Sequence, residues 1–447
     1  MAKKQASTSE PLEKLEQREL HILKLIHSGT NNSRLELAKQ AGLSPSSITA
    51  IVQRLIKKGL VLESKPAESA LGRKPIPLRI RSDAAYLVGV DLGSFYLRIV
   101  ITDINGEIVF KLQTRTEMKA GRERVLEKAF LCIHEAIRES KIPLRQIKGI
   151  GIAHSGVIDS EAGVVLSYPR PGQMADWKNA SLREIFQNEF HLPCLLEDSV
   201  RTTTIAEKYF GMGRDLDSFI YIDVGMGIGA GIVLDGKIYR GAGGRAGEFG
   251  HITVNENGPL CSCGNHGCLE TMASCGAIIH NVRVAIEKGI DSKIRELADG
   301  DLDKISIELI ALASAQDDSL AFRVLQRSAS YIGIGLASLV NLLNPRVMIF
   351  GGALFREVPQ LLFDPLRRII KQRSLEQSAN EVQLKVSTLG SEACALGAAR
   401  LIAERILEDL YVNWSARSES SSSATTGSPS QRRAASPDPA ESAVGAS

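Results

Sequence analysis

Cysteine is scarce in this chain, and a long uninterrupted apolar run is absent. Seven cysteines occur in 447 residues, and an odd number of thiols does not indicate a disulfide framework. The longest apolar stretch, Ile332–Phe355, is interrupted by asparagine, proline and arginine between positions 341 and 346, so we expect no membrane span and no membrane partner. The basic start is followed by no apolar segment, so no signal peptide is expected. These absences favour a cytoplasmic protein.

Positive charge is concentrated near the N-terminus. Residues 14–81 hold 13 Lys/Arg and 5 Asp/Glu, a net charge of +8, whereas the whole chain carries +3 and the remainder therefore −5. A basic head on a mildly acidic body indicates a polyanionic partner for the head alone. The hydrophobic content of 44% is ordinary for a globular protein, and the length suggests about three domains.

The basic head has the pattern of a winged helix-turn-helix. Apolar residues at helical spacing predict a first helix around 20–26, Ser33 is placed to cap a second helix over 34–40, and Ser44-Pro45 is placed to open a third that ends near Gly59. The intervening turn contains glycine, as this motif requires. Two short apolar segments, 60–63 and 75–80, predict a hairpin that would be the wing.

DNA contacts are predicted on the outward face of the third helix and on the wing. The inward stripe of that helix is apolar, and a glycine beside adjacent Arg and Lys in the wing loop can reach into a narrow A·T minor groove. The alternative is a three-helix interaction domain with a solvated polar face and a charged turn. The predicted DNA-binding residues are Pro45, Ser46, Ser47, Thr49, Ala50, Gln53, Arg54, Arg73 and Lys74.

One loop gathers metal ligands with the spacing His-x9-Cys-x-Cys-x4-Cys. Three thiolates and one imidazole complete a tetrahedral set for Zn²⁺, and a closed set is structural because no position remains for water. The alternative is three buried free cysteines and an unrelated histidine. The predicted ligands of this structural Zn²⁺ are His251, Cys261, Cys263 and Cys268, and the flanking Glu248 and Glu270 are not needed to complete the set.

The rest of the chain predicts a duplicated α/β body between two disordered ends. Tyr86–Gly93 and Phe219–Gly225 each read as a strand that ends in Asp-x-Gly and is followed by a second strand. Two such units suggest an internal duplication, and alternating strands and helices fit α/β layers. The predicted segments are a mobile arm at 1–13, the head at 14–82, the body at 83–412 and a disordered, Ser-rich tail at 413–447.

The glycine-rich run between Val224 and His251 resembles the signature of the ROK family (repressors, open reading frames and kinases). Glycines stand at 227, 229, 231, 241, 247 and 250, and the metal loop that follows fits the family at every ligand. The resemblance covers about residues 14–412. It implies an actin-like, two-lobed sugar-kinase (ribonuclease H-like) α/β body behind the winged helix-turn-helix. The implied lobes are about 83–197 with a C-terminal helix at 392–412, and about 198–391.

The resemblance also implies a sugar cleft between the lobes. In ROK proteins the residues that match Glu248, His251 and Glu270 hold sugar hydroxyls, and charge-assisted bonds from carboxylates are short and directional. Ligation of one ring nitrogen by the metal fixes the imidazole tautomer and leaves the other nitrogen as a donor to the sugar. The alternative for each glutamate alone is a solvated surface charge. Asp198 and Ser199 complete the expected sugar-binding set.

Three positions depart from the kinase pattern. The first phosphate loop of ROK kinases is Asp-x-Gly-Gly-Thr, and here Phe95 stands at the position of the threonine. The second loop, Gly-Thr-Gly, is here Gly225-Met226-Gly227. The Glu-Asn-Asp triplet of the kinases is Glu197-Asp198-Ser199, so a serine occupies the position of the general base, and its pKa is too high for that role near neutral pH. We therefore expect no enzymatic activity.

The sequence favours a sugar-responsive transcriptional repressor that binds operator DNA as a homodimer or homotetramer. Alternatives are an ATP-dependent sugar kinase with an appended DNA-binding domain and a body that only binds another protein. The effector is expected to be a sugar or a sugar phosphate. Ser199 removes a negative charge near the sugar 6-oxygen and Arg201 is two residues away, which favours a 6-phosphorylated sugar. Alternatively, Ser199 records only the loss of kinase activity.

Overall fold

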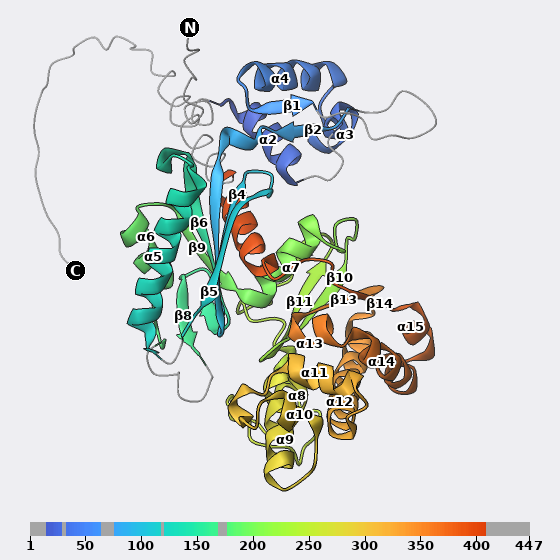
Figure 1. Cartoon of the computed structure of the whole chain (residues 1–447). Helices are drawn as coiled ribbons and strands as arrows, with labels where there is room; N and C mark the ends of the chain where they lie inside the picture. The colour runs from blue at the N-terminus through green and yellow to red at the C-terminus, as the bar shows by residue number, and fades with distance from the viewer. Residues whose placement is uncertain (1–14, 29–32, 64–75, 118–119, 169–176, 408–447) are drawn as a thin grey trace, which may run out of the picture.

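The computed structural model describes residues 15–28, 33–63, 76–117, 120–168 and 177–407 (Figure 1). The predicted arm, the wing residues Arg73 and Lys74, and the predicted tail at 413–447 lie outside these ranges. None of the described helices is long and apolar enough to cross a membrane.

Three helices and a two-stranded hairpin form the head, as predicted. The Ser33 hydroxyl accepts the Glu36 N–H at 3.2 Å, and the Ser44 hydroxyl accepts the Ser47 N–H at 3.2 Å, so both predicted N-caps are present. Gly42, between these helices, adopts the left-handed conformation with a φ of 61°. The elements are α2 (Gln17–Ser28), α3 (Arg34–Ala41), α4 (Pro45–Lys57) and the antiparallel strands β1 (Val61–Glu63) and β2 (Leu78–Ile80).

The body contains two five-stranded sheets with the same topology. Their strand orders are β5-β4-β3-β6-β9 and β12-β11-β10-β13-β14. In each sheet the three strands that come first in the chain pair antiparallel with their neighbours. Two later strands extend the sheet in parallel from the other side of the first strand. The internal duplication predicted from the two Asp-x-Gly units is therefore confirmed. The first sheet comprises β3 (Tyr86–Leu92), β4 (Tyr96–Asp103), β5 (Ile108–Arg115), β6 (Ile147–His154) and β9 (Cys194–Asp198), and the second comprises β10 (Phe219–Val224), β11 (Ile228–Leu234), β12 (Lys237–Ile238), β13 (Val347–Gly351) and β14 (Gln383–Val386).

Helices cover both sheets and join them. On the first lobe α5 (Arg122–Ser140) packs against β4 and β5, and α6 (Leu182–Phe190) packs against β9 and β8. β8 (Val164–Ser167) forms a small hairpin with β7 (Val157–Asp159). The helix α7 (Ser199–Phe210) lies between the lobes, in contact with β9 and β11 (Figure 1). The second lobe carries α8 (Leu269–Ala273), α9 (Cys275–Glu287), α10 (Lys293–Leu297), α11 (Ile307–Ala315), α12 (Ser319–Leu343), α13 (Gly352–Glu357), α14 (Pro359–Arg373) and α15 (Glu376–Glu381).

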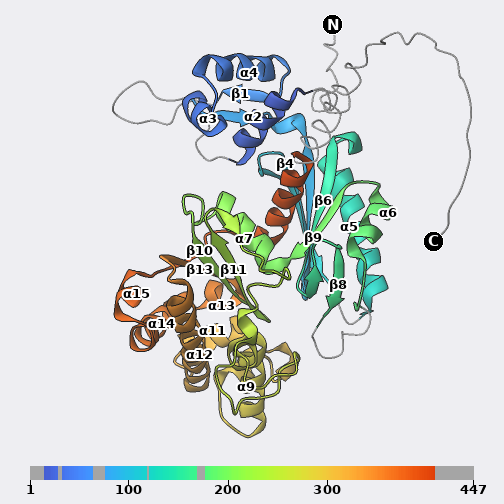
Figure 2. The ribbon, with the colours of Figure 1, turned by 180° about the vertical axis from the view of Figure 1, so that it is seen from behind.

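A helix over residues 393–407 returns to the first lobe, where it lies beside α7 in both views (Figures 1 and 2). Glycines allow its backbone to approach closely, because a Cβ at Gly89 or Gly151 would lie 1.9 Å from the carbonyl oxygen of Ala395 or Ala398. The same helix shares one buried apolar cluster with β3, β4 and the three helices of the head. The C-terminal helix and the first strands of the body thus both pack against the head.

Substitution of Gly151 by alanine is expected to destabilise the protein by about 2–3 kcal/mol, since overpacking against backbone cannot be relieved by a side-chain rotation. Thermal unfolding measures this. In Gly390→Ala the new methyl would meet only the end of the Glu392 side chain, at 2.8 Å, which can rotate away, so this control should unfold close to the wild-type temperature. Equal melting temperatures for the two variants would contradict the close packing described here.

Candidate functional site

A cleft of about 1060 Å³ is lined by residues of both lobes. The turns that follow β3 and β10 face it from the two sheets, and the N-terminus of α7 forms part of its wall. All five predicted sugar-binding residues line this one cavity: Asp198, Ser199, Glu248, His251 and Glu270.

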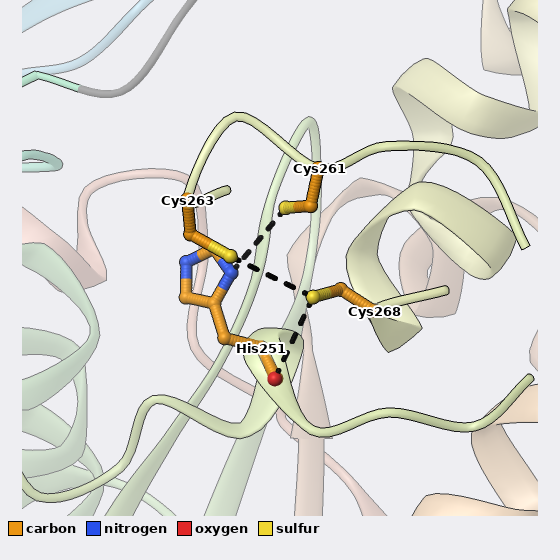
Figure 3. A group of neighbouring side chains, drawn as sticks. All are labelled: His251, Cys261, Cys263 and Cys268. Carbon is orange, nitrogen blue, oxygen red and sulfur yellow. Dashed lines mark hydrogen bonds between the residues drawn. The ribbon is translucent and has the colours of Figure 1, made fainter. Parts of the chain in front are cut away.

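The four predicted metal ligands lie close together (Figure 3), and one of them, His251, lines the cleft. Their donor atoms lie within 4.8 Å of one another. The Cys263 and Cys268 sulfurs are 3.7 Å apart, and the Cys261 sulfur is 3.6 Å from Nδ1 of His251. Tetrahedral zinc with ordinary Zn–S and Zn–N bonds places such atoms about 3.8 Å and about 3.6 Å apart. The geometry and the donor chemistry of this set therefore fit Zn²⁺.

The His251 ring presents its second nitrogen to the cleft. Nδ1 faces the thiols, while Nε2 lies 3.9 Å from Oε2 of Glu248. This separation is too long for a direct hydrogen bond. Glu270 lies in the first turn of α8, two residues after Cys268, and its Oε2 accepts the Ile228 N–H at 3.0 Å. An imidazole nitrogen and two carboxylates thus lie at the cleft wall beside the predicted metal ligands.

Asp198 and Ser199 form the beginning of α7. Oδ1 of Asp198 accepts the N–H groups of Val200 and Arg201 at 3.0 and 2.9 Å, so Asp198 is the N-cap of the helix. Burial raises the pKa of Asp198 to about 6, although Arg201 opposes the shift. Its carboxylate is therefore a cleft acceptor that titrates close to neutral pH.

The neighbouring Glu197 is buried and accepts hydrogen bonds from residues of both lobes. Its carboxylate accepts Nε of Arg201 at 2.8 Å, two N–H groups of Arg240 at 2.9 and 3.1 Å, and the Ser160 hydroxyl at 2.8 Å. Burial acts to raise the pKa of Glu197, but the two arginines outweigh it and the pKa is lowered. Arg201 is itself only 3% exposed, so the guanidinium expected near a sugar 6-phosphate is engaged with Glu197.

The two turns that match phosphate loops carry bulky or paired side chains. Nη1 of Arg98 lies 3.0 Å from Oδ2 of Asp91, so the carboxylate at the end of β3 is already in an ion pair. Phe95 is 46% exposed and lines the cleft, as does Met226 in the second turn. Phe95 and Met226 thus line the cleft from the turns after β3 and β10, outside the loop that carries the predicted metal ligands.

The outward face of α4 is exposed, whereas its apolar stripe is buried as predicted. Pro45, Ser46, Ala50, Gln53 and Arg54 are exposed, and Ser47 and Thr49 are half-buried. Nε of Arg54 donates to the buried carboxylate of Glu19 on α2 at 3.0 Å. The other residues of α4 that are predicted to contact DNA lie together on the exposed side of the helix.

Two arginines make long-range contacts that no sequence motif predicts. Arg240 reaches Glu197 across 43 positions. Arg400 in the C-terminal helix donates to the backbone carbonyl of His27 in α2 at 2.8 Å, across 373 positions, and its guanidinium lies 4.0 Å from the ring centre of Tyr209 in α7. Isolated arginines without motif spacing cannot be paired from sequence alone.

Comparison with known proteins finds relatives that match both the head and the body. A model described as the ROK family matches residues 87–405, and one described as the MarR family matches residues 6–69. The xylose repressor of Caldicellulosiruptor bescii is 32% identical over 390 residues, which cover 87% of this chain and 96% of that repressor.

Two solved structures extend the comparison. A ROK family transcriptional regulator, a homolog of the Escherichia coli Mlc protein, has a TM-score of 0.72 and 30% identity and covers 89% of this chain and 98% of its own. A ROK family glucokinase from Streptomyces griseus, solved with glucose and AMPPNP, has a TM-score of 0.62 and 29% identity and covers 71% of this chain and 99% of its own. The regulator therefore accounts for more of this chain than the kinase.

Replacement of Cys263 by serine is expected to lower the bound zinc from one ion per chain to a small fraction, because a closed four-ligand site loses one thiolate. Elemental analysis of freshly purified protein measures the content. Cys132→Ser, at a half-buried thiol outside the cluster, is the matched control and should retain the metal. Wild-type protein without zinc would refute the site.

Proposed function

The chain belongs to the ROK family, and we propose that it is a DNA-binding transcriptional repressor whose cleft binds a sugar effector. The observation that carries the proposal is the presence, in one chain, of an exposed α4 face on a basic head and of a polar cleft wall beside a His/Cys cluster that could hold a metal ion. The relatives that match over head and body are repressors and regulators. We expect a homodimer on a two-fold operator, since a single head reads one half-site.

The sugar is proposed to bind between the metal loop and the start of α7. His251 Nε2 and Glu248 are 3.9 Å apart, a spacing in which one hydroxyl can accept from the imidazole and donate to the carboxylate. Glu270, Asp198 and Ser199 are the further proposed contacts. Zinc, when bound, would be a structural tie that fixes the tautomer and position of His251. Xylose is the first candidate, because it is the sugar named for the C. bescii relative.

Phosphoryl transfer is not part of the proposal. It depends on positioned phosphates and on charge stabilisation in the transition state. Ser199 is at the base position, Asp91 is paired with Arg98, and Phe95 fills the first turn. The kinase alternative predicts ATP consumption with a sugar, and a coupled assay that detects turnover would favour it.

The recognition face can be tested by a charge introduced on α4. Gln53→Glu is expected to weaken DNA binding about tenfold or more, since it sets a carboxylate against the phosphate backbone or a base edge. Fluorescence anisotropy with an operator selected from a random DNA library measures the affinity. Gln187→Glu, the same change on the exposed face of α6, should bind as the wild type does. Equal affinities for all three proteins would argue against α4 as the recognition helix.

The effector affinity should depend on pH through Asp198. Its pKa of about 6 means that the carboxylate is ionised at pH 7.5 and mostly protonated at pH 5.5. If only the ionised form accepts sugar hydroxyls, affinity falls by about fourfold over this interval. Calorimetry with xylose, or with the best sugar from a thermal-shift panel, measures the change, and zinc content is checked at both pH values. Asp198→Asn should remove the dependence, and a variant with an unchanged pH profile would exclude Asp198 as its source.

A further inference from the structure

Three carboxylates line the cleft together with His251, and we call them the acidic group: Asp198, Glu248 and Glu270. Burial raises the pKa of Asp198, and the charges of Glu197 and Glu248 raise it further. A like charge shifts a pKa in this way only when it lies nearby. Glu248 of the second lobe therefore lies close to the start of α7, and the two lobes present like charges to one part of the cleft.

Glu270 is connected to both of these places through tight packing. Its Oε2 accepts the N–H of Ile228 in β11, and the next residue, Gly229, faces α7, because a Cβ there would lie 2.8 Å from Cγ2 of Val200. A Cβ at Gly250, the neighbour of His251 in the chain, would lie 3.3 Å from Cβ of Glu270. Glu270 is thus packed against the segment that carries His251 and bonded to the strand that contacts α7.

Within the described ranges, no lysine or arginine forms an ion pair with a member of the acidic group. Arg201, in the first turn of α7, is 3% exposed and donates its Nε to Glu197 at 2.8 Å. Arg240 also donates to Glu197. With Glu197 included, four carboxylates (−4) stand beside two arginines (+2), a net charge of −2. Zinc in the predicted site would add no positive charge, since its three thiolates outweigh it.

The surroundings of Ser199 are acidic as well. Ser199 stands at the position of the kinase base, so it is the residue expected near the sugar 6-oxygen. Its carbonyl accepts the Cys394 thiol at 3.5 Å, and burial together with the Asp91 carboxylate raises the pKa of that thiol. Asp198 precedes Ser199 in the chain, and Asp91 lies close by through Cys394. Arg98 is already paired with Asp91 at 3.0 Å, so this pair offers no net positive charge here.

We propose that the cleft selects an uncharged sugar and rejects its phosphate ester, and that the acidic group imposes this selection. Carboxylates accept hydrogen bonds from sugar hydroxyls, and these charge-assisted bonds are strong. A phosphate would instead be held beside like charges, which costs affinity. The inference rests on the proposed function and specifies the class of its effector. It reverses the expectation of a 6-phosphorylated sugar, because Arg201 is engaged with Glu197.

This selection determines which metabolic change the protein reports. Transfer of a phosphoryl group to the sugar replaces a neutral hydroxyl by a charged ester, which the acidic group repels. Phosphorylation is therefore the class of reaction that consumes the effector and ends the response. The repressor reports a sugar that is present in its free form, before any kinase has acted on it.

Calorimetry on the full-length protein at pH 7.5 and constant ionic strength tests the selection with matched pairs of probes. The pairs are glucose with glucose 6-phosphate, N-acetylglucosamine with its 6-phosphate, and xylose with α-xylose 1-phosphate. We expect at least one free sugar to bind, and its ester to bind at least about tenfold more weakly. The neutral probe 6-O-methylglucose adds bulk at the same oxygen as the phosphate of glucose 6-phosphate, so it should bind more tightly than that ester does.

Two substitutions test whether the carboxylates cause the selection. Glu248→Gln removes one charge from a side chain that is 52% exposed, so it should fold and should narrow the affinity ratio of sugar to ester about threefold or more. Glu197→Gln releases Arg201 and should raise the affinity for the ester, and its thermal unfolding shows whether it is folded. Glu376→Gln, the same change at an exposed residue of α15, is the matched control and should keep the wild-type ratio.

The possible failures are distinguishable. An ester that binds as tightly as its parent sugar would overturn the selection and leave the proposed sugar effector standing. Equal loss for 6-O-methylglucose and glucose 6-phosphate would show that size, rather than charge, is rejected. A wild-type ratio in Glu248→Gln would overturn the role of the acidic group. Absence of binding by every probe would instead contradict the proposed function on which this inference rests.

Discussion

The buried carboxylate of Glu197 holds the two lobes in their relative positions. It stands on β9 of the first lobe and receives Arg201 from α7 and Arg240 from the second lobe. A buried carboxylate left without its partners costs about 3–5 kcal/mol. Movement of one lobe against the other must therefore keep these contacts or replace them. Because Glu197 directly precedes Asp198 in the chain, these contacts also fix the position of Asp198 in the cleft wall.

Helix α7 extends this constraint from the cleft toward the DNA-binding head. It begins at the Asp198 cap, and Tyr209 near its end lies under the guanidinium of Arg400. Arg400 in turn bonds to the carbonyl of His27 at the end of α2. A ligand shifts a protein only as far as its affinities for two conformations differ. A shift of α7 on sugar binding would reach the head through this buried contact.

Sequence reasoning succeeded where neighbouring residues determine the structure. Ser33 and Ser44 cap helices through N–H groups three positions away, and the metal ligands lie within eighteen positions of one another, so their spacing carries the signal. The two Asp-x-Gly turns predicted the duplicated sheets. Glu197–Arg240 and His27–Arg400 have no such spacing, because the tertiary fold alone brings them together.

The residues that line the cleft fall into two groups. The first group is His251, Glu248 and Glu270, which under the proposed function contact the bound sugar in its ground state. The second group lies in and beside the turns after β3 and β10, where Arg98 pairs with Asp91 at 3.0 Å and Phe95 and Met226 line the cleft. A catalyst needs interactions that strengthen in the transition state, whereas a regulator needs only a difference in binding between two conformations. Under the proposed function, sugar binding by the first group would therefore suffice for regulation without any group that stabilises a transition state.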